Sequence, residues 1–217
     1  MPVALSRVRT NGIETTVATA GSGPAVLLLH GFPHTWQLWR EVLPTLTRTH
    51  RVIAPDQRWT GSDATGGYDA GTLAADALGI LDALGEPSAT VVGIDAGTPS
   101  AALLALRHPG RVRRLVVMES LLGTLPGGED FLAAGPPWWF GFHAVPGLAE
   151  EVLAGHEAAY LDFFLAAGTR GRASRPASGT PSSPPTPAPP PCAAPFPSTG
   201  SCRAPPGSSR RRCASAA

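Results

Sequence analysis

The chain has 217 residues, enough for one large domain or for a domain with an extension, and 43% of them are hydrophobic, so a sizeable core can form. All 17 basic residues are arginine, and the formal net charge of +1 argues against a protein that binds nucleic acid. Neither a signal peptide nor an apolar stretch of membrane-spanning length is evident, so we expect a cytoplasmic protein without a membrane partner.

The composition changes abruptly near residue 170. Residues 1–170 hold 11 arginines and all 16 acidic residues, whereas residues 171–217 hold six arginines, 12 prolines and one large apolar residue, Phe196. Such a segment cannot bury enough surface to offset the entropy of ordering its backbone, so we predict that it is disordered. A frameshifted or mis-joined C-terminus explains the change better than a native tail. Three cysteines in this segment show no metal-ligand spacing: Cys192, Cys202 and Cys213.

The first 60 residues predict a hairpin followed by strands that alternate with a helix. Residues 6–19 are typical of a β-hairpin with Thr10-Asn11-Gly12 as its turn. The apolar run 25–29 is typical of a strand that is buried on both faces of a parallel sheet, and residues 52–54 form a second such run. Between them, four large apolar side chains fall on one face of a predicted helix: Trp36, Trp39, Leu43 and Leu46.

The alternation continues to residue 119. An amphipathic helix that carries Leu73 and Leu84 ends at Gly85, and a strand, a helix and a further strand follow at 89–94, 97–108 and 114–118. This order favours an α/β fold with a parallel sheet. Four segments are predicted to be neighbouring parallel strands: 25–31, 51–55, 89–94 and 113–119.

After Ser120 the alternation stops. Residues 121–170 begin with glycines and prolines, continue with an aromatic cluster at 138–140, and are predicted to include one helix that carries Leu153, Tyr160 and Phe164. We interpret this segment as a helical insertion. The chain therefore divides into a core at 1–120, the insertion at 121–170 and the tail at 171–217.

The segment from Gly93 to Gly97 carries the strongest chemical signal. Strand, tight turn and helix are the context of a nucleophile elbow, and the exposed residue of this turn is a carboxylate, Asp95. A carboxylate attacks a saturated carbon that bears a leaving group and forms an alkyl ester. The alternative is an ordinary Gly/Asp turn after a strand. A serine esterase is disfavoured, since Ser100 lies inside the predicted helix and no Gly-x-Ser-x-Gly stands elsewhere.

Four segments in one ordered series resemble the α/β-hydrolase superfamily, in its branch of epoxide hydrolases and haloalkane or haloacid dehalogenases. The resemblance spans residues 6–170. The loop His30-Gly31-Phe32-Pro33 resembles the oxyanion-loop motif, and Asp56 to Ser62 resembles the acid-x-Arg-Gly-x-Gly-x-Ser loop, with Trp59 where glycine is usual. Gly93 to Gly97 resembles the elbow, with Ile94 in place of the usual histidine. Trp138 to Glu150 resembles the start of a helical cap.

The resemblance implies an α/β-hydrolase fold with a partial cap, and it assigns roles residue by residue. Asp95 is the expected nucleophile, and the backbone N–H groups of Phe32 and Ala96 are the expected oxyanion hole. We expect His30 to shape the oxyanion loop rather than to act chemically. The resemblance implies no cofactor and no metal, and it implies a small apolar molecule as the substrate.

Four further side chains have alternative interpretations. Glu119 ends a strand at the position where some haloalkane dehalogenases place the acid that orients their histidine, or it is a helix-capping or loop residue. Tyr160 is the one tyrosine of the cap-like segment and a candidate for protonating an epoxide oxygen. Trp138 and Trp139 are candidate substrate-pocket residues that donate an indole N–H, or they belong to the core.

An epoxide is favoured over a halide as the electrophile. Haloalkane dehalogenases commonly have tryptophan after the nucleophile and asparagine in the oxyanion loop, where this chain has Ala96 and Phe32. The family's base is a histidine after the last strand, but the final histidine here is His156. The alternative to a complete hydrolase is therefore an inactive or single-turnover fragment, and a dehalogenase is a further alternative. Substrate identity and oligomeric state stay open.

Overall fold

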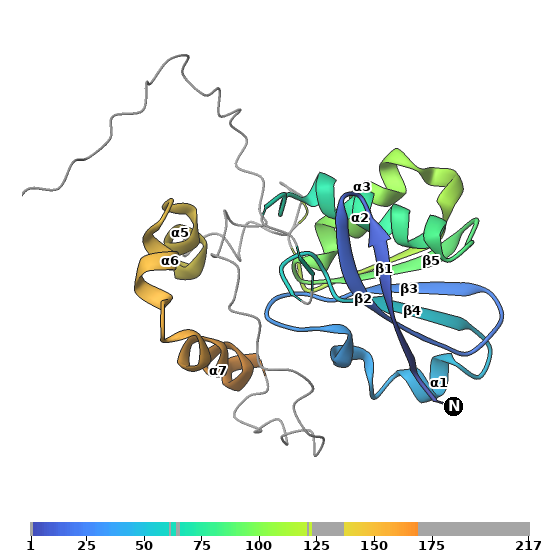
Figure 1. Ribbon diagram of the computed structural model, residues 1–217, viewed down its shortest axis with the longest axis horizontal. Coiled ribbons are helices and arrows are strands. Elements are labelled where there is room, and N and C mark those ends of the chain that lie inside the picture. The colour runs from blue at the N-terminus through green and yellow to red at the C-terminus, as the bar shows by residue number, and fades with distance from the viewer. Residues whose placement is uncertain (1, 61, 64–65, 121, 123–136, 169–217) are drawn as a thin grey trace, which may run out of the picture.

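A computed structural model of the chain describes residues 2–60, 62–63, 66–120, 122 and 137–168. The described residues form a six-stranded sheet in the order β1-β2-β4-β3-β5-β6, with helices on both faces of the sheet and three further helices after it (Figure 1). The strands are β1 (Ala4–Thr10), β2 (Ile13–Ala20), β3 (Ala25–Leu29), β4 (Arg51–Pro55), β5 (Ala89–Ile94) and β6 (Val112–Met118). The helices are η1 (Trp36–Trp39), α1 (Leu43–Leu46), α2 (Ala70–Ala83), α3 (Gly97–Arg107), η2 (Pro109–Arg111), α5 (Trp138–Ala144), α6 (Leu148–Leu153) and α7 (Glu157–Gly168).

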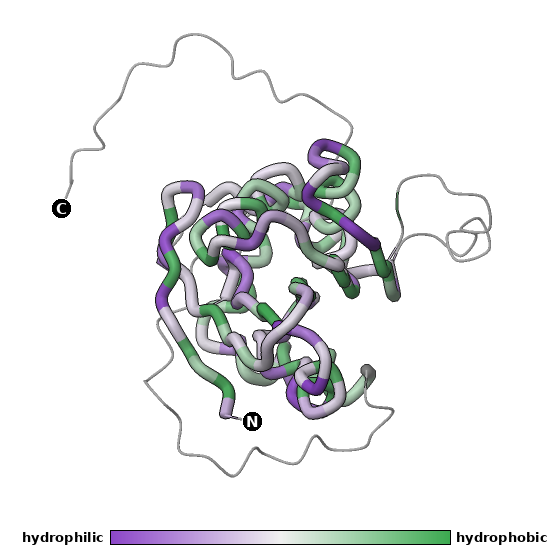
Figure 2. The backbone as a smooth tube through the Cα atoms, turned by 90° about the vertical axis from the view of Figure 1, so that its right-hand side faces the viewer, coloured by the Kyte–Doolittle hydropathy of each residue, from purple (hydrophilic) through white to green (hydrophobic). Residues whose placement is uncertain are grey.

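The four predicted parallel strands are confirmed as neighbours. β3 pairs in parallel with β4 and with β5, and β5 pairs in parallel with β6. The predicted hairpin is also confirmed, because β1 and β2 pair antiparallel around a turn in which Asn11 and Gly12 have φ values of 41° and 77°. The hairpin extends the sheet through antiparallel pairing of β2 with β4. Hydrophobic and hydrophilic residues are interspersed along β1, which lies at the sheet edge near the labelled N-terminus (Figure 2).

Helices cover the sheet unequally. On one face α2 and α3 pack against alternate residues of the central strands, and Leu27, Ile53 and Val91 are fully buried there. On the other face η1 and α1 bury Trp39 and Leu43 against the intervening residues of β3 and β4. Since both faces of β3 are covered, all five of its residues are buried, as the continuous apolar run predicts.

Two predicted helices are wrong in extent. The single helix through Trp36 and Leu46 is a 3-10 helix followed by a short α-helix, because Pro44 has no N–H with which to continue helical hydrogen bonding across the junction. The helix predicted to carry Leu153, Tyr160 and Phe164 is two helices. α6 ends at Leu153 and α7 begins at Glu157, and Gly155 between them has a left-handed φ of 80°.

β6 forms one edge of the sheet within the described part of the chain. Three apolar side chains of this strand, Leu115, Val116 and Val117, are 40%, 42% and 44% exposed. None of the helices described in the structure is long and apolar enough to cross a membrane. The predicted disordered segment 171–217, with its cysteines and Phe196, and residues 123–136 of the predicted insertion lie outside the described residues.

Candidate functional site

Asp95 occupies the sharp turn between β5 and α3. Its φ is 50°, a left-handed value that a residue with a Cβ adopts at a cost of about 1–3 kcal/mol, so surrounding contacts must hold the turn. The Asp95 N–H donates to the Met118 carbonyl at the end of β6 over 3.0 Å. The buried hydroxyl of Thr98 lies 2.9 Å from the Gly93 carbonyl oxygen and 3.0 Å from that of Met118. The strand-turn-helix predicted for this segment is therefore present.

Two glycines allow the backbone to come close to this turn. A Cβ on Gly31 would overlap the Cβ of Asp95 and lie 2.5 Å from its Oδ2 atom. A Cβ on Gly97 would overlap the carbonyl oxygen of Leu29 at the end of β3. Any larger residue at either position would push the oxyanion loop and the elbow apart.

The Asp95 carboxylate accepts hydrogen bonds from the two N–H groups assigned to the oxyanion hole. The Phe32 N–H lies 2.9 Å from Oδ2, and the Ala96 N–H also donates to this carboxylate. Burial nevertheless raises the pKa of Asp95 above its ordinary value, and the negative charge of Glu119 adds to the rise. The two N–H groups and His34 act in the opposite direction. Donors to the carboxylate favour its ionised form, but desolvation outweighs them.

His30 holds the oxyanion loop in place. Its ring is fully buried, Nδ1 donates to the Gly31 carbonyl over 2.9 Å, and Nε2 accepts from the Gln57 N–H over 3.0 Å. Burial lowers the pKa of His30 to about 4, so the ring is neutral at physiological pH. Asp56 adds a second contact, since its Oδ1 accepts from the Trp36 N–H at 2.8 Å. These contacts support the structural role expected for His30.

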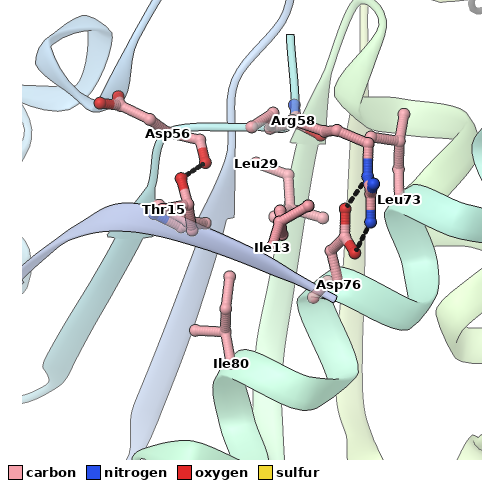
Figure 3. Close-up of a pocket in the computed structure, with 11 residues that line it drawn as sticks. Ile13, Thr15, Leu29, Asp56, Arg58, Leu73, Asp76 and Ile80 are labelled. Carbon is pink, nitrogen blue, oxygen red and sulfur yellow. Dashed lines mark hydrogen bonds and ion pairs between the residues drawn. The ribbon is translucent and has the colours of Figure 1, made fainter. Parts of the chain in front are cut away.

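A buried ion pair holds the loop that follows β4. Arg58 donates to both carboxylate oxygens of Asp76 on α2, from Nε over 2.8 Å and from Nη2 over 2.7 Å (Figure 3). Their side chains are 9% and 8% exposed. Arg58 also donates to the carbonyls of Asn11 in the hairpin turn and of Gly66. Arg58 and Asp76 line the pocket in Figure 3, whereas Asp95 does not, so this pocket lies apart from the candidate nucleophile.

Two titratable residues interact electrostatically with Asp95. Glu119 follows β6, has a left-handed φ of 49°, and lies near enough for its charge to raise the pKa of Asp95. The two roles expected for Glu119, an acid that orients a histidine or a capping or loop residue, both stay predictions. His34 has no role in the sequence-based prediction, yet its charge also acts on Asp95. A tight turn, in which the His34 N–H donates to the Gly31 carbonyl, folds His34 back toward the site. This turn begins within the motif His30-Gly31-Phe32-Pro33, which was the local signal that could have indicated the position of His34.

The helices after the sheet bring aromatic side chains to the oxyanion loop. The ring of Phe32, which is 40% exposed, meets the rings of His143 and Phe164 edge to face at centroid distances of 6.4 and 6.0 Å. The predicted pocket residues Trp138, Trp139 and Tyr160 all contact Phe164. The His143 Nε2 and Tyr160 hydroxyl atoms are 2.6 Å apart. The sequence-based prediction gave His143 no role.

The described residues contain no group of three or more His, Cys, Asp or Glu side chains that could hold a metal ion. The functional groups described near the oxyanion loop are the carboxylates of Asp95 and Glu119, two backbone donors, three histidines and the phenol of Tyr160. Among these groups, the Asp95 carboxylate is the one held directly by both candidate oxyanion donors.

The sheet order, the elbow and the oxyanion loop define an α/β hydrolase, and comparison with known proteins agrees. The profile of the α/β-hydrolase fold family matches residues 24–188, so the chain belongs to this family. Several of its relatives are named as epoxide hydrolases. Epoxide hydrolase 3 of Siraitia grosvenorii is 37% identical over 164 residues, which cover 71% of this chain and 52% of the relative.

Two further comparisons point to the same group. The soluble epoxide hydrolase of Corynebacterium sp. (strain C12) is 36% identical over 123 residues, which cover 56% of this chain and 43% of the relative. A crystal structure of an epoxide hydrolase from Vigna radiata superimposes with a TM-score of 0.64 and 26% identity, over 77% of this chain and 57% of the other. The chain thus spans about half the length of the curated relatives it matches.

Replacing Asp95 by asparagine is expected to stabilise the protein at pH 7. The raised pKa means that the folded protein retains a proton at pH values where the unfolded chain, with an ordinary pKa of 3.8, has lost it. Wild-type stability therefore falls as the pH rises through the interval between these two pKa values. The asparagine side chain does not titrate, so the variant does not lose this stability as the pH rises. The difference in stability between Asp95→Asn and wild type should vanish below pH 3.8 and reach a plateau above the pKa of Asp95 in the folded protein.

Thermal unfolding of both proteins as a function of pH measures this effect. The matched control is Asp69→Ala, which removes the N-cap carboxylate of α2 and should lower stability at pH 7 by about 1 kcal/mol. A lower unfolding midpoint for Asp95→Asn than for wild type at pH 7 would contradict the assignment of Asp95 as a residue that destabilises the fold.

Proposed function

We propose that this chain opens epoxides through covalent attack by Asp95. The observation that carries the proposal is the Asp95 carboxylate itself, presented on a left-handed turn and held by the Phe32 and Ala96 N–H groups. An Asp95 oxygen forms a bond to a ring carbon, the carbon–oxygen bond of the ring breaks, and its electron pair goes to the ring oxygen. The ring oxygen then takes a proton, for which Tyr160 is the candidate donor. Two relatives named as epoxide hydrolases support this choice of electrophile.

The product of this step is an alkyl ester on Asp95. When water attacks the ester, the carbonyl oxygen becomes negative, and the Phe32 and Ala96 N–H groups, which donate to the Asp95 carboxylate, are the candidate donors to it. A positioned base that activates the water typically contributes a factor of ~10²–10⁴ in rate. The last histidine of the 217 residues is His156, and His34 is the histidine whose charge acts on Asp95. We expect the 217-residue chain, assayed alone, to accumulate the ester.

Incubation with styrene oxide followed by peptide mass spectrometry tests the proposal. An adduct on Asp95 is expected in wild type, with a loss of more than about 10³-fold in Asp95→Asn, because an amide oxygen is a far weaker nucleophile. Asp82→Asn on α2, whose side chain is 59% exposed, is the control and should leave labelling unchanged. Labelling that survives in Asp95→Asn would contradict the proposal. Sustained turnover by wild type would contradict the expectation that the ester accumulates. If His34→Gln abolished that turnover, His34 would be identified as the base.

A further inference from the structure

The edge strand β6 is open on one side and carries exposed apolar side chains on both of its faces. Within the described part of the chain, β5 is the strand that pairs with it. Leu115, Val116 and Val117 are all exposed. Because successive side chains of a strand alternate, Leu115 and Val117 lie on one face and Val116 on the other. An exposed apolar edge is a template for pairing with a further strand.

The backbone groups of Leu115 and Val117 face away from β5. The Met118 carbonyl faces β5, since it accepts from the N–H of Asp95, the residue that directly follows this strand. The N–H and C=O groups of alternate residues along a strand face the same side, so those of Val116 face β5 as well. Leu115 and Val117 therefore present theirs to the open edge, where none of the described strands lies.

A second copy of the same strand fits this edge in an antiparallel arrangement. A two-fold axis through the sheet at Val116 sets Val116 of one copy beside Val116 of the other. Leu115 of each copy then lies opposite Val117 of the other. Because both of these residues have outward-facing backbone groups, they form a hydrogen-bonded pair on either side of the axis. Apolar side chains thus meet apolar side chains at all three positions.

Like charges distinguish this register from the one next to it. β6 carries Arg113 and Arg114 just before its apolar residues. A register centred on Leu115 would offset the Arg114 residues of the two copies by about 7 Å along the strand, whereas the register centred on Val116 offsets them by about 14 Å. The larger offset exceeds the Debye length of ~10 Å in 0.1 M salt, so these like charges are largely screened from each other.

Unlike charges meet at both ends of the ladder in the register centred on Val116. Arg113 of one copy lies opposite Glu119 of the other, and both residues are exposed. Arg113 donates to the Ala25 carbonyl over 3.2 Å, and its guanidinium has further N–H donors for a carboxylate. The left-handed φ of Glu119 ends the strand, so the two residues meet through their side chains rather than through the ladder.

We propose that two copies of this chain form a dimer in which β6 pairs antiparallel with β6, with Val116 at the two-fold axis. The sheet then continues from one copy into the other, and the open edge of β6 is covered together with its apolar side chains. The proposal does not depend on the reaction assigned to Asp95.

Sedimentation equilibrium of the 217-residue chain at several concentrations tests the dimer. A monomer–dimer equilibrium is expected. Val116→Arg should raise its dissociation constant more than about 100-fold, because the substitution sets two like charges directly opposite each other at the axis. Val152→Arg, at a valine of α6 that is 50% exposed, is the matched control and should leave the dissociation constant unchanged. A chain that is monomeric at every concentration, or a dimer that Val116→Arg leaves intact, would overturn the proposal.

Disulfide cross-linking tests the register. In a background with all three cysteines of the chain replaced by serine, oxidation of Val116→Cys should give a covalent dimer. The Cα atoms of a non-hydrogen-bonded antiparallel pair are about 4.5 Å apart, which is within the range that a disulfide spans. Leu115→Cys in the same background would lie opposite Val117 and should not cross-link with itself. Cross-linking of Leu115→Cys in preference to Val116→Cys would overturn this register.

A charge exchange tests the ends of the ladder without altering an apolar side chain. Arg113→Glu and Glu119→Arg should each raise the dissociation constant about 10-fold, and the double exchange should restore it to within about threefold of wild type. Arg113→Glu and the double exchange both lose the hydrogen bond to Ala25, so the recovery reports the contact between copies. Equal weakening in the double exchange would contradict the paired charges.

Hydrogen exchange at the amides of Leu115 and Val117 distinguishes the possible occupants of the edge. If a second copy covers β6, protection of these amides should rise with protein concentration. Protection that does not depend on concentration would show that another part of the same chain covers the strand. Fast exchange at every concentration would show that the edge stays open, and either of these two results would overturn the dimer.

Discussion

Replacing Arg58 by alanine is expected to lower the free energy of unfolding by about 3 kcal/mol, because the substitution leaves the Asp76 carboxylate buried without its cationic partner. Asp76 is 8% exposed and accepts two hydrogen bonds from Arg58. The effect should lie at the lower end of the range for buried ion pairs, because the Asn11 side chain still donates to Asp76 over 2.8 Å. Denaturant unfolding followed by circular dichroism measures the change.

Two further variants give this prediction its controls. Arg58→Met combined with Asp76→Leu removes both charges, and it should be less destabilising than the sum of the two single changes. Arg9→Ala removes an arginine whose side chain is 88% exposed and should leave the unfolding midpoint unchanged. Additive effects of the Arg58 and Asp76 substitutions would contradict a coupled buried pair. An undiminished midpoint in Arg58→Ala would contradict its role in holding the loop.

The sheet could be predicted from local patterns because each central strand carries its own signal. The run at 25–29 is continuous and apolar, and the run at 89–94 is rich in β-branched residues. Helix-length segments separate the strands, so parallel pairing with helices over both faces is the arrangement that buries them. The elbow could be predicted for a similar reason. Its five residues are adjacent in sequence, and the small residues that its geometry requires surround Asp95.

The ends of the helices and the side chains that lie near Asp95 were harder to predict, because they depend on weak local patterns or on residues far apart in the sequence. A periodic apolar pattern continues across Pro44 and across Gly155, so periodicity alone merged helices that the backbone separates. His143 and Tyr160 are 17 residues apart on two different helices, and no local pattern predicts their hydrogen bond. His34 is close to Asp95 only because a turn at Gly31 reverses the chain.

The burial of Asp95 illustrates the same limit for electrostatics. The sequence predicts N–H donors beside this carboxylate, and donors favour ionisation. How much water the surrounding chain removes is a property of the packed structure, and it reverses the direction of the pKa shift. The same desolvation that raises the pKa of Asp95 also removes water that would otherwise solvate the attacking carboxylate oxygen.

Replacing Gly31 by alanine is expected to slow labelling of Asp95 by styrene oxide about 100-fold. The new Cβ would overlap the Asp95 side chain and lie 2.5 Å from Oδ2, so the carboxylate must rotate or the loop must move. Either change lengthens the 2.9 Å hydrogen bond from the Phe32 N–H. A displacement of about 1 Å in a reacting group can cost a factor of ~10² in rate. Gly110→Ala is the matched control, since a Cβ there meets open space, and it should leave labelling unchanged.

Overpacking also affects stability, so the two effects of Gly31→Ala must be separated. Gly31→Ala should lower the free energy of unfolding by about 1–3 kcal/mol in the wild-type background. In an Asp95→Gly background most of that loss should disappear, because the overlapping side chain is gone and glycine accepts the φ of 50° at position 95. Labelling rates are compared at a temperature where both proteins are folded. An equal loss of stability in the two backgrounds, or undiminished labelling of Gly31→Ala, would show that close approach of the oxyanion loop to Asp95 does not set the geometry of attack.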